Sequence, residues 1–172
     1  MNKEFDIIII GAGIVGLTFA KALAKLPLQI AIVDRSAPQM TWQPDNYELR
    51  VSAITQASQN IFSSLGVWKS IVAKRISPFR EMQVWDASGE GQIHFNSADL
   101  AFPHIGHIVE NSAIVQSLWE ELAKCDNVTA LFEEKLTEVL SEPCPTLITE
   151  KGSQLQAQLI VGADGANSWL RR

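Results

Sequence analysis

The sequence is poor in the residues that build metal centres and redox motifs, and it has no excess of positive charge. Its 172 residues include two cysteines and three histidines, and the formal net charge is −5. Cys125 and Cys144 lack metal or redox spacing, so nothing requires an oxidising compartment. His104 and His107 have no third ligand placed with them, which argues against a metal site. The acidic charge argues against a nucleic-acid partner, because such partners bind basic surfaces.

Long hydrophobic runs are also missing. The best candidate, residues 7–24, is interrupted by three glycines and by Lys21. Glu4 and Asp6 precede it at the place where a signal peptide carries positive charge. A membrane helix needs about 20 consecutive apolar residues. We therefore predict no signal peptide, no transmembrane segment and a cytoplasmic location, for a globular chain with 47% hydrophobic residues.

The sequence does contain a glycine motif between a predicted strand and a predicted helix. Four isoleucines at residues 7–10 are typical of a strand buried on both faces of a parallel sheet. They lead into G-x-G-x-x-G at residues 11–16, and apolar residues then recur at helical spacing as far as Pro27. A second strand is predicted at residues 30–33, followed by Asp34. This order predicts a dinucleotide-binding βαβ unit rather than a βαβ unit with chance glycines.

Each member of the motif has a physical role. Gly11 permits the tight turn, Gly13 lets the backbone approach a pyrophosphate, and Gly16 allows helix and strand to pack closely. The free N–H groups at the start of the helix attract the anion. Asp34 stands 23 residues after Gly11, close to the spacing of about 20 residues expected of a carboxylate that binds ribose hydroxyls.

The rest of the chain predicts short strands and helices around an inserted hairpin. A long polar loop at residues 36–47 precedes a predicted helix at 56–65, and alternating residues on either side of Ser88 and Gly89 predict a β-hairpin. Further elements are predicted at residues 108–109 (strand), 112–123 (helix), 128–132, 146–149 and 155–161 (strands). The sequence therefore predicts an α/β, Rossmann-like domain with a parallel sheet. Its two parts are residues 1–76 and 107–172, and the inserted β segment is residues 77–106.

A second motif closes the chain. The apolar residues 159–161 are followed by Gly162, Ala163, Asp164 and Gly165, so a buried strand again ends in glycines and an acid. A carboxylate at the carboxyl end of a parallel strand lies where α/β sheets bind ligands. The alternative is an ordinary turn with a polar cap on a following helix. We interpret the motif as a second wall of the cofactor site and expect a helix to begin after it.

Together these segments resemble the flavin-dependent aromatic hydroxylases related to p-hydroxybenzoate hydroxylase, and among them the ubiquinone-biosynthesis hydroxylases. The similar segments follow the family's order and are residues 11–16, 49–54, 65–68, 84–86, 107–112 and 162–168. Two of them, 84–86 and 107–112, are most similar to members that act at ring position 5 of 2-octaprenylphenol. Family members are longer, with a further Gly-Asp motif, so the resemblance implies an N-terminal piece that is inactive alone and binds FAD weakly or not at all.

The resemblance implies an FAD-dependent monooxygenase that hydroxylates a polyprenyl phenol in ubiquinone biosynthesis, with NAD(P)H as reductant and O₂ as the oxygen source. Because the cofactor carries this chemistry, we expect no catalytic side chain and no metal. Other ubiquinone-biosynthesis proteins are the expected partners, and through them the protein would reach the inner membrane. Two alternatives stay open: another FAD- or NAD-dependent oxidoreductase, and a non-catalytic docking module.

The resemblance also implies roles for individual residues. Those that would hold the adenosine and pyrophosphate end of FAD are Gly11, Gly13, Gly16 and Asp34. Arg35 would flank the adenine, and the adjacent Asp34 argues against a 2′-phosphate there.

Four more residues would lie near the flavin half of the cofactor or beside it. Arg50 would contact the phosphate–ribityl region, for which a guanidinium is suited, and the alternative is a surface arginine. Asn111 stands at a helix start where relatives often carry Arg or Gln, so its contact stays open. Asp164 and Gly165 would lie beside FAD and the passing nicotinamide cofactor.

Overall fold

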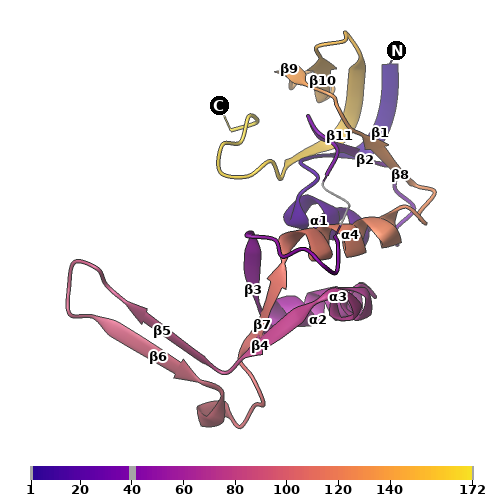
Figure 1. The fold of residues 1–172 in the computed structure, drawn as a ribbon. Helices are drawn as coiled ribbons and strands as arrows, with labels where there is room; N and C mark the ends of the chain where they lie inside the picture. The colour runs from indigo at the N-terminus through magenta and orange to yellow at the C-terminus, as the bar shows by residue number, and fades with distance from the viewer. Residues whose placement is uncertain (1, 39–41, 172) are drawn as a thin grey trace. The chain divides into compact units, whose positions relative to one another are not determined.

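The computed structural model describes residues 2–38 and 42–171, which form two compact units (Figure 1). The first unit consists of Met1–Thr41 and Val115–Arg172, and the second of Trp42–Ile114. The inserted segment predicted at residues 77–106 lies within the second unit. Part of the loop predicted at residues 36–47, namely 39–41, lies outside the described residues.

A six-stranded sheet forms the centre of the first unit, in the order β8-β2-β1-β11-β10-β9. The strands are β1 (Asn2–Ile10), β2 (Ile30–Val33), β8 (Val128–Leu131), β9 (Leu136–Leu140), β10 (Thr146–Thr149) and β11 (Gln154–Gly162). β1 pairs in parallel with both β2 and β11, and β2 pairs in parallel with β8. β10 pairs antiparallel with β11, and β9 pairs antiparallel with β10 at the edge of the sheet. The α/β fold with a mainly parallel sheet is confirmed.

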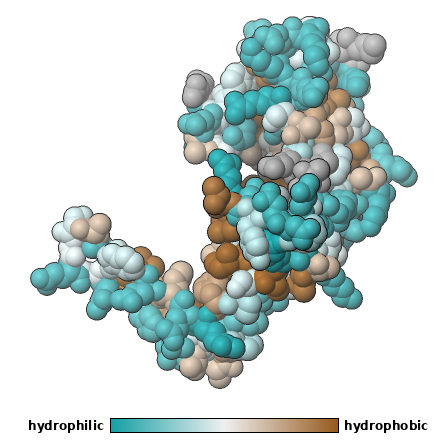
Figure 2. All heavy atoms as spheres, in the orientation of Figure 1, coloured by the Kyte–Doolittle hydropathy of each residue, from teal (hydrophilic) through white to brown (hydrophobic). Residues whose placement is uncertain are grey.

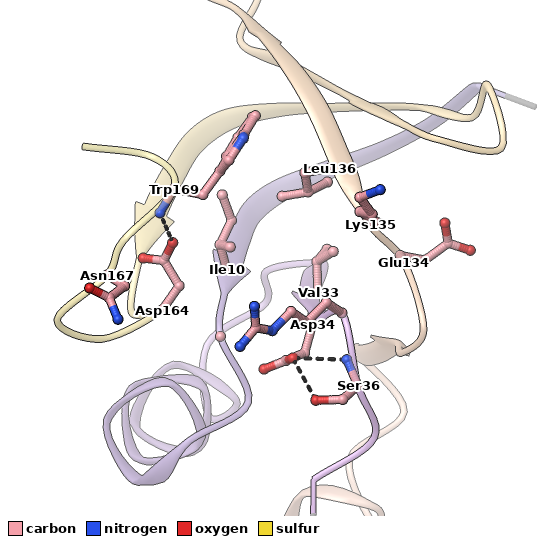
Figure 3. A pocket seen from close by; sticks show the side chains of 12 residues that line it. Ile10, Val33, Asp34, Ser36, Glu134, Lys135, Leu136, Asp164, Asn167 and Trp169 are labelled. Atoms are coloured by element: carbon pink, nitrogen blue, oxygen red, sulfur yellow. Dashed lines mark hydrogen bonds between the residues drawn. The ribbon is translucent and has the colours of Figure 1, made fainter. Parts of the chain in front are cut away.

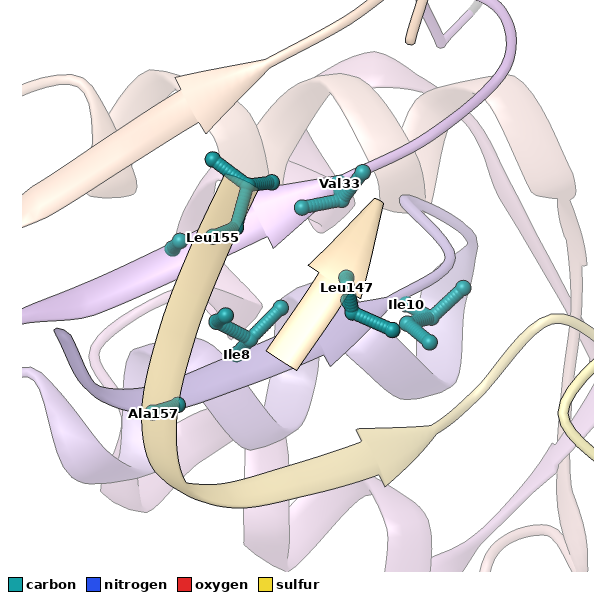
Figure 4. Packing of buried hydrophobic residues seen from close by; sticks show 7 residues of the cluster. Ile8, Ile10, Val33, Leu147, Leu155 and Ala157 are labelled. Atoms are coloured by element: carbon teal, nitrogen blue, oxygen red, sulfur yellow. The ribbon is translucent and has the colours of Figure 1, made fainter. Parts of the chain in front are cut away.

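The isoleucine strand supplies the core because it lies in the middle of the sheet. Ile8 and Ile9 have no exposed surface, and neither do the four residues of β2. Branched side chains suit this position, since they pack well on a pleated surface. On one face, Leu147 of β10 and Leu155 of β11 join Ile8 in a single cluster (Figure 4).

Two helices belong wholly or partly to the first unit. Helix α1 (Ile14–Leu23) follows the glycine motif and buries Leu17 and Ala20. Helix α4 (Asn111–Leu122) begins in the second unit and continues into the first. An ion pair of 3.7 Å between Lys21 Nζ and a carboxylate oxygen of Glu121 joins α1 to α4. No helix in the described part of the chain is long and apolar enough to span a membrane.

The second unit contains a three-stranded antiparallel sheet in the order β3-β7-β4 and a separate hairpin, β5–β6. Its elements are β3 (Val51–Thr55), α2 (Gln56–Ser64), α3 (Trp68–Lys74), β4 (Ile76–Phe79), β5 (Glu81–Trp85), β6 (Gln92–Asn96), the 3-10 helix η1 (Ser97–Leu100) and β7 (Gly106–Glu110). The hairpin predicted around Ser88 and Gly89 is present.

Some elements differ from the sequence-based expectations. Strands β3, β4 and β9, helix α3 and the 3-10 helix η1 were not predicted. β4 contains Pro78, which argues against a central strand, but β4 is an edge strand, where proline is tolerated. The prediction of a helix that begins after Gly165 is wrong for the described residues up to Arg171, which form turns.

Candidate cofactor site

The glycine motif and the ends of β2 and β11 meet at the carboxyl edge of the first unit's sheet. The amide of Gly11 donates to the carbonyl of Val33 (2.8 Å), and the amide of Ala163 donates to the carbonyl of Ile10 (2.7 Å). A cavity of about 580 Å³ opens at this edge and is lined by residues that include Asp34 and Asp164. Figure 3 shows these two carboxylates on either side of Ile10. Ligand pockets in proteins have volumes of this size.

Gly11 and Gly16 are required by close contacts of the backbone. Gly11 has a φ of +110°, and a Cβ there would lie 2.4 Å from the carbonyl oxygen of Ala163. A Cβ on Gly16 would lie 1.9 Å from the carbonyl oxygen of Gly11. Neither position therefore accepts a side chain without opening the turn between β1 and α1.

Gly13 is different, because nothing lies within 4 Å of the position its Cβ would take. This open space is at the N-terminus of α1, which no side chain among the described residues caps. The free N–H groups and the helix dipole favour an anion there. The arrangement fits the pyrophosphate of a dinucleotide, since a side chain on Gly13 would fill the space that the anion needs.

Asp34 organises the backbone of the site. One carboxylate oxygen accepts a hydrogen bond from the amide of Ala12 (2.8 Å), and the other accepts from the amide (3.0 Å) and hydroxyl (3.3 Å) of Ser36. A carboxylate offers about four acceptor positions. Asp34 therefore ties the glycine motif to the end of β2 and keeps capacity for about one further donor, such as a ribose hydroxyl.

Asp164 holds the turn that follows β11. Its carboxylate accepts a hydrogen bond of 2.6 Å from the amide of Trp169. Burial raises the pKa of Asp164, but hydrogen bonds from Ser168 and Trp169 outweigh it, so the pKa lies below its usual range. The ionised carboxylate can accept hydrogen bonds from hydroxyl groups but repels phosphate. Gly165 follows with a φ of +85°, which glycine adopts readily.

Glu134 and Lys135 also line the cavity, although neither was predicted from the sequence as a site residue. The amide of Glu134 donates to the carbonyl of Asp34 (3.1 Å), so the segment after β8 lies against the end of β2. Arg35 lines the same cavity and is exposed. The predicted strand at residues 128–132 could have indicated these two residues, because they follow its carboxyl end and the carboxyl ends of parallel strands share one edge of a sheet.

Arg50 and Asn111 lie together in the second unit. The carbonyl of Arg50 accepts a hydrogen bond from the amide of Asn111 (3.0 Å), and the side chain of Asn111 accepts one from the hydroxyl of Ser52 (2.6 Å). The side chain of Arg50 is exposed, between the exposed residues Leu49 and Val51. In Figure 2, hydrophobic side chains gather in the region that β3 occupies in Figure 1. The contact of either residue with a cofactor stays a prediction.

Comparison with known proteins gives the family context of this site. Residues 4–172 match the sequence pattern of the FAD binding domain family. The chain is 31% identical over 172 residues to the 3-demethoxyubiquinol 3-hydroxylase of Escherichia coli, covering 99% of the chain and 44% of that protein. It is 34% identical over 186 residues to the mitochondrial ubiquinone biosynthesis monooxygenase of Danio rerio, covering 99% of the chain and 38% of that protein. The chain thus spans less than half the length of these relatives.

A solved structure supports the fold. The flavin-dependent monooxygenase PieE, in complex with FAD and substrate, superposes with a TM-score of 0.75 at 18% identity. The superposition covers 98% of the chain and 31% of PieE. At this identity the likeness establishes the fold alone.

Proposed function

Since the chain belongs to the FAD binding domain family, we propose that it holds the adenosine and pyrophosphate end of FAD at the carboxyl edge of the first unit's sheet. One observation carries the proposal. The open space at Gly13, at the start of α1, lies on the same sheet edge as a cavity bordered by Asp34. In a turn that binds no ligand, the space beside Gly13 would not have to stay empty, and a side chain could cap the N-terminus of α1.

Each residue then has a defined task. The backbone at Gly13 and the first N–H groups of α1 bind the pyrophosphate, and Asp34 accepts a hydrogen bond from a ribose hydroxyl. Arg35 flanks the adenine, and Asp164 with Gly165 forms the opposite wall. When bound, FAD supplies the redox chemistry, in which it accepts electrons from NAD(P)H and reacts with O₂. These side chains bind and orient the cofactor and transfer no proton.

We propose hydroxylation of a polyprenyl phenol in ubiquinone biosynthesis as the activity of the protein that contains this chain. The names of the two curated relatives support it, since they describe a demethoxyubiquinol hydroxylase and a ubiquinone biosynthesis monooxygenase. Ring position 5, a cytoplasmic location and contact with the inner membrane through other ubiquinone-biosynthesis proteins are part of the same proposal.

The test of the cofactor site is a titration with FAD, followed by flavin fluorescence, of the protein extended to the full length of its relatives. Gly13→Ala fills the open space, and we expect it to weaken FAD binding at least tenfold, because a methyl group displaces the anion from the N–H groups. Gly91→Ala is the matched control, since a Cβ on Gly91 in the hairpin also meets nothing within 4 Å. Equal affinity of the two variants would refute the site.

The activity is tested in the protein extended to the full length of its relatives. Incubation with a polyprenyl phenol, NAD(P)H and ¹⁸O₂ should give a ring-hydroxylated product that carries one ¹⁸O atom. NAD(P)H consumption without incorporation of ¹⁸O would indicate a different flavin-dependent oxidoreductase. Absence of both reactions in a flavin-loaded protein would favour a docking module.

A further inference from the structure

The cavity of the first unit has an apolar side as well as the polar side described above. Asp34 and Ser36 border it at the end of β2. Hydrocarbon and aromatic surface lines it at Ile10, Leu136 and Trp169, all of which belong to the first unit. Figure 3 shows the side chains of Trp169 and Leu136 on either side of Ile10. A ligand that fills this cavity therefore needs an apolar part as well as hydroxyl groups.

Trp169 is held in place by contacts within the chain. Its amide donates the hydrogen bond of 2.6 Å to the carboxylate of Asp164. Its side chain packs against the buried cluster that includes Ile10 and Leu147. Because Trp169 is only partly buried and lines the cavity, part of its indole ring is open to a ligand.

Leu136, the other large apolar residue of this wall, is fixed as well. It is the first residue of β9 and pairs with Thr149 of β10. The residue before it, Lys135, forms an ion pair of 2.7 Å with Glu150, and its carbonyl accepts a hydrogen bond from the Glu150 amide (2.8 Å). A wall that is ordered before the ligand arrives reduces the entropy lost on binding.

We propose that Trp169 is a binding residue for the adenine ring of FAD, which packs against the indole in the apolar half of the cavity. This inference rests on the proposed function, in which Asp34 binds the ribose of the adenosine. Adenine is bonded directly to that ribose, whereas the isoalloxazine ring lies beyond the pyrophosphate. The planar ring that enters the cavity with the ribose is therefore adenine.

The chemistry of the two rings supports this contact. Aromatic rings attract one another in offset-stacked and edge-to-face arrangements, and purine and pyrimidine bases stack on aromatic side chains in nucleic-acid complexes. Arg35 lines the same cavity, so the guanidinium and the indole can contact one adenine ring. Trp169 would thus select a dinucleotide that carries a purine at this end.

FAD binding by the protein extended to the full length of its relatives tests the inference. We expect Trp169→Ala to weaken FAD binding roughly tenfold, and Trp169→Phe less than threefold, because phenylalanine keeps an aromatic ring. Trp85→Ala is the matched control, since Trp85 is a 69% exposed tryptophan on β5 in the second unit. The control should bind FAD as the unmodified protein does.

Nuclear Overhauser effects give a readout that a packing role alone would not produce. In the unmodified protein loaded with FAD, we expect cross-peaks between the indole protons of Trp169 and H2 or H8 of the adenine. The spectrum of Trp169→Phe identifies the indole resonances.

Each remaining outcome refutes a definite statement. If the unmodified protein fails to bind FAD, the proposed function fails and the inference falls with it. If it binds FAD without an indole–adenine cross-peak, only the inference fails, and Trp169 serves the core alone. Equal affinity of Trp169→Ala and the unmodified protein would refute the inference as well. If Trp169→Ala does not fold, Trp169→Leu keeps an apolar side chain without a ring and must show the same loss of affinity.

Discussion

At the scale of single residues, the glycines of the motif divide into two kinds. Gly11 and Gly16 are required by the fold, because a Cβ on either would overlap a backbone oxygen. Gly13 is not required by the fold, since a Cβ there meets open space. The sequence predicts a different role for each glycine. The contacts indicate that Gly11 and Gly16 are needed for the fold, whereas Gly13 is free to serve in binding.

Gly16→Ala should therefore destabilise the fold more than Gly13→Ala does. We expect Gly16→Ala to lower the free energy of unfolding by about 1–3 kcal/mol or more, because overpacking against backbone cannot relax easily. Gly13→Ala should lower it by about 1 kcal/mol or less, since Gly13 is the N-cap of α1 and glycine is preferred to alanine there. Urea unfolding followed by circular dichroism measures both values. A stable Gly16→Ala protein would show that the turn between β1 and α1 can open without cost.

The charged residues of the site give a second prediction at this scale. In the full-length protein, Arg50→Ala should weaken FAD binding by about 1.5–3 kcal/mol if the guanidinium contacts an anionic group. Asp34→Ala should weaken it as well, and also lower stability, because Asp34 holds the amides of Ala12 and Ser36. At saturating FAD, neither substitution should slow oxygen transfer, which stopped-flow reoxidation of the reduced flavin measures. A persistent slowing would assign these residues a part in the chemistry.

At the scale of elements, Glu110 at the end of β7 joins a loop to the residue after α3. Its carboxylate accepts hydrogen bonds from Trp42 and Glu48 of the loop and from Arg75. Burial raises the pKa of Glu110, but hydrogen bonds from Glu48 and Trp42 and the charge of Arg75 outweigh it, so the pKa lies below its usual range. The carboxylate therefore stabilises the folded chain at pH values above the unfolded pKa. That contribution is lost as the pH falls through the lower, folded-state pKa.

Glu110→Gln should accordingly lose stability relative to the unmodified chain at pH 7, by the same amount down to about pH 5. Below the ordinary pKa of a glutamate side chain, 4.5, the difference in stability should shrink, because the unmodified chain then loses its carboxylate contribution. Urea unfolding at pH 7, 5 and 3.5 tests this sign. A difference that grows on acidification would mean that the folded state prefers the protonated form.

The elements also show which parts of the structure a sequence can predict. β1, β2 and the turn to α1 were predictable because continuous apolar runs and glycines at fixed spacing encode them locally. Helix α3 spans Trp68–Lys74, too short to display a helical period. The ion pair between Arg75 and Glu110 could not be predicted for another reason. These residues are far apart in the sequence and are brought together by the pairing of β4 with β7. Glu134 and Lys135 follow β8, and its carboxyl end was not recognised from the sequence as part of the same sheet edge.

At the scale of the whole molecule, the described residues differ widely in how well they are buried. The hairpin β5–β6 is exposed along almost its whole length, including apolar Val84 (48%) and its cross-strand partner Ile93 (52%). A two-stranded hairpin by itself is marginally stable. We expect its amides to exchange with solvent at least a hundredfold faster than those of β1 and β2. Exchange monitored by NMR or mass spectrometry checks this, and equal protection would indicate that another surface covers the hairpin.

The pairing of β1 with β11 has a consequence for how the chain folds during synthesis. Asn2 to Ile10 lie against Gln154 to Gly162, so one side of the isoleucine strand finds its partner only after residue 162 has been made. At typical translation rates of about 5–20 residues per second, this interval lasts roughly 8–30 s. During that time an apolar strand edge is open to wrong partners, including the same strand of a neighbouring nascent chain. A chaperone that covers the edge of β1 until β11 emerges would suppress such pairing.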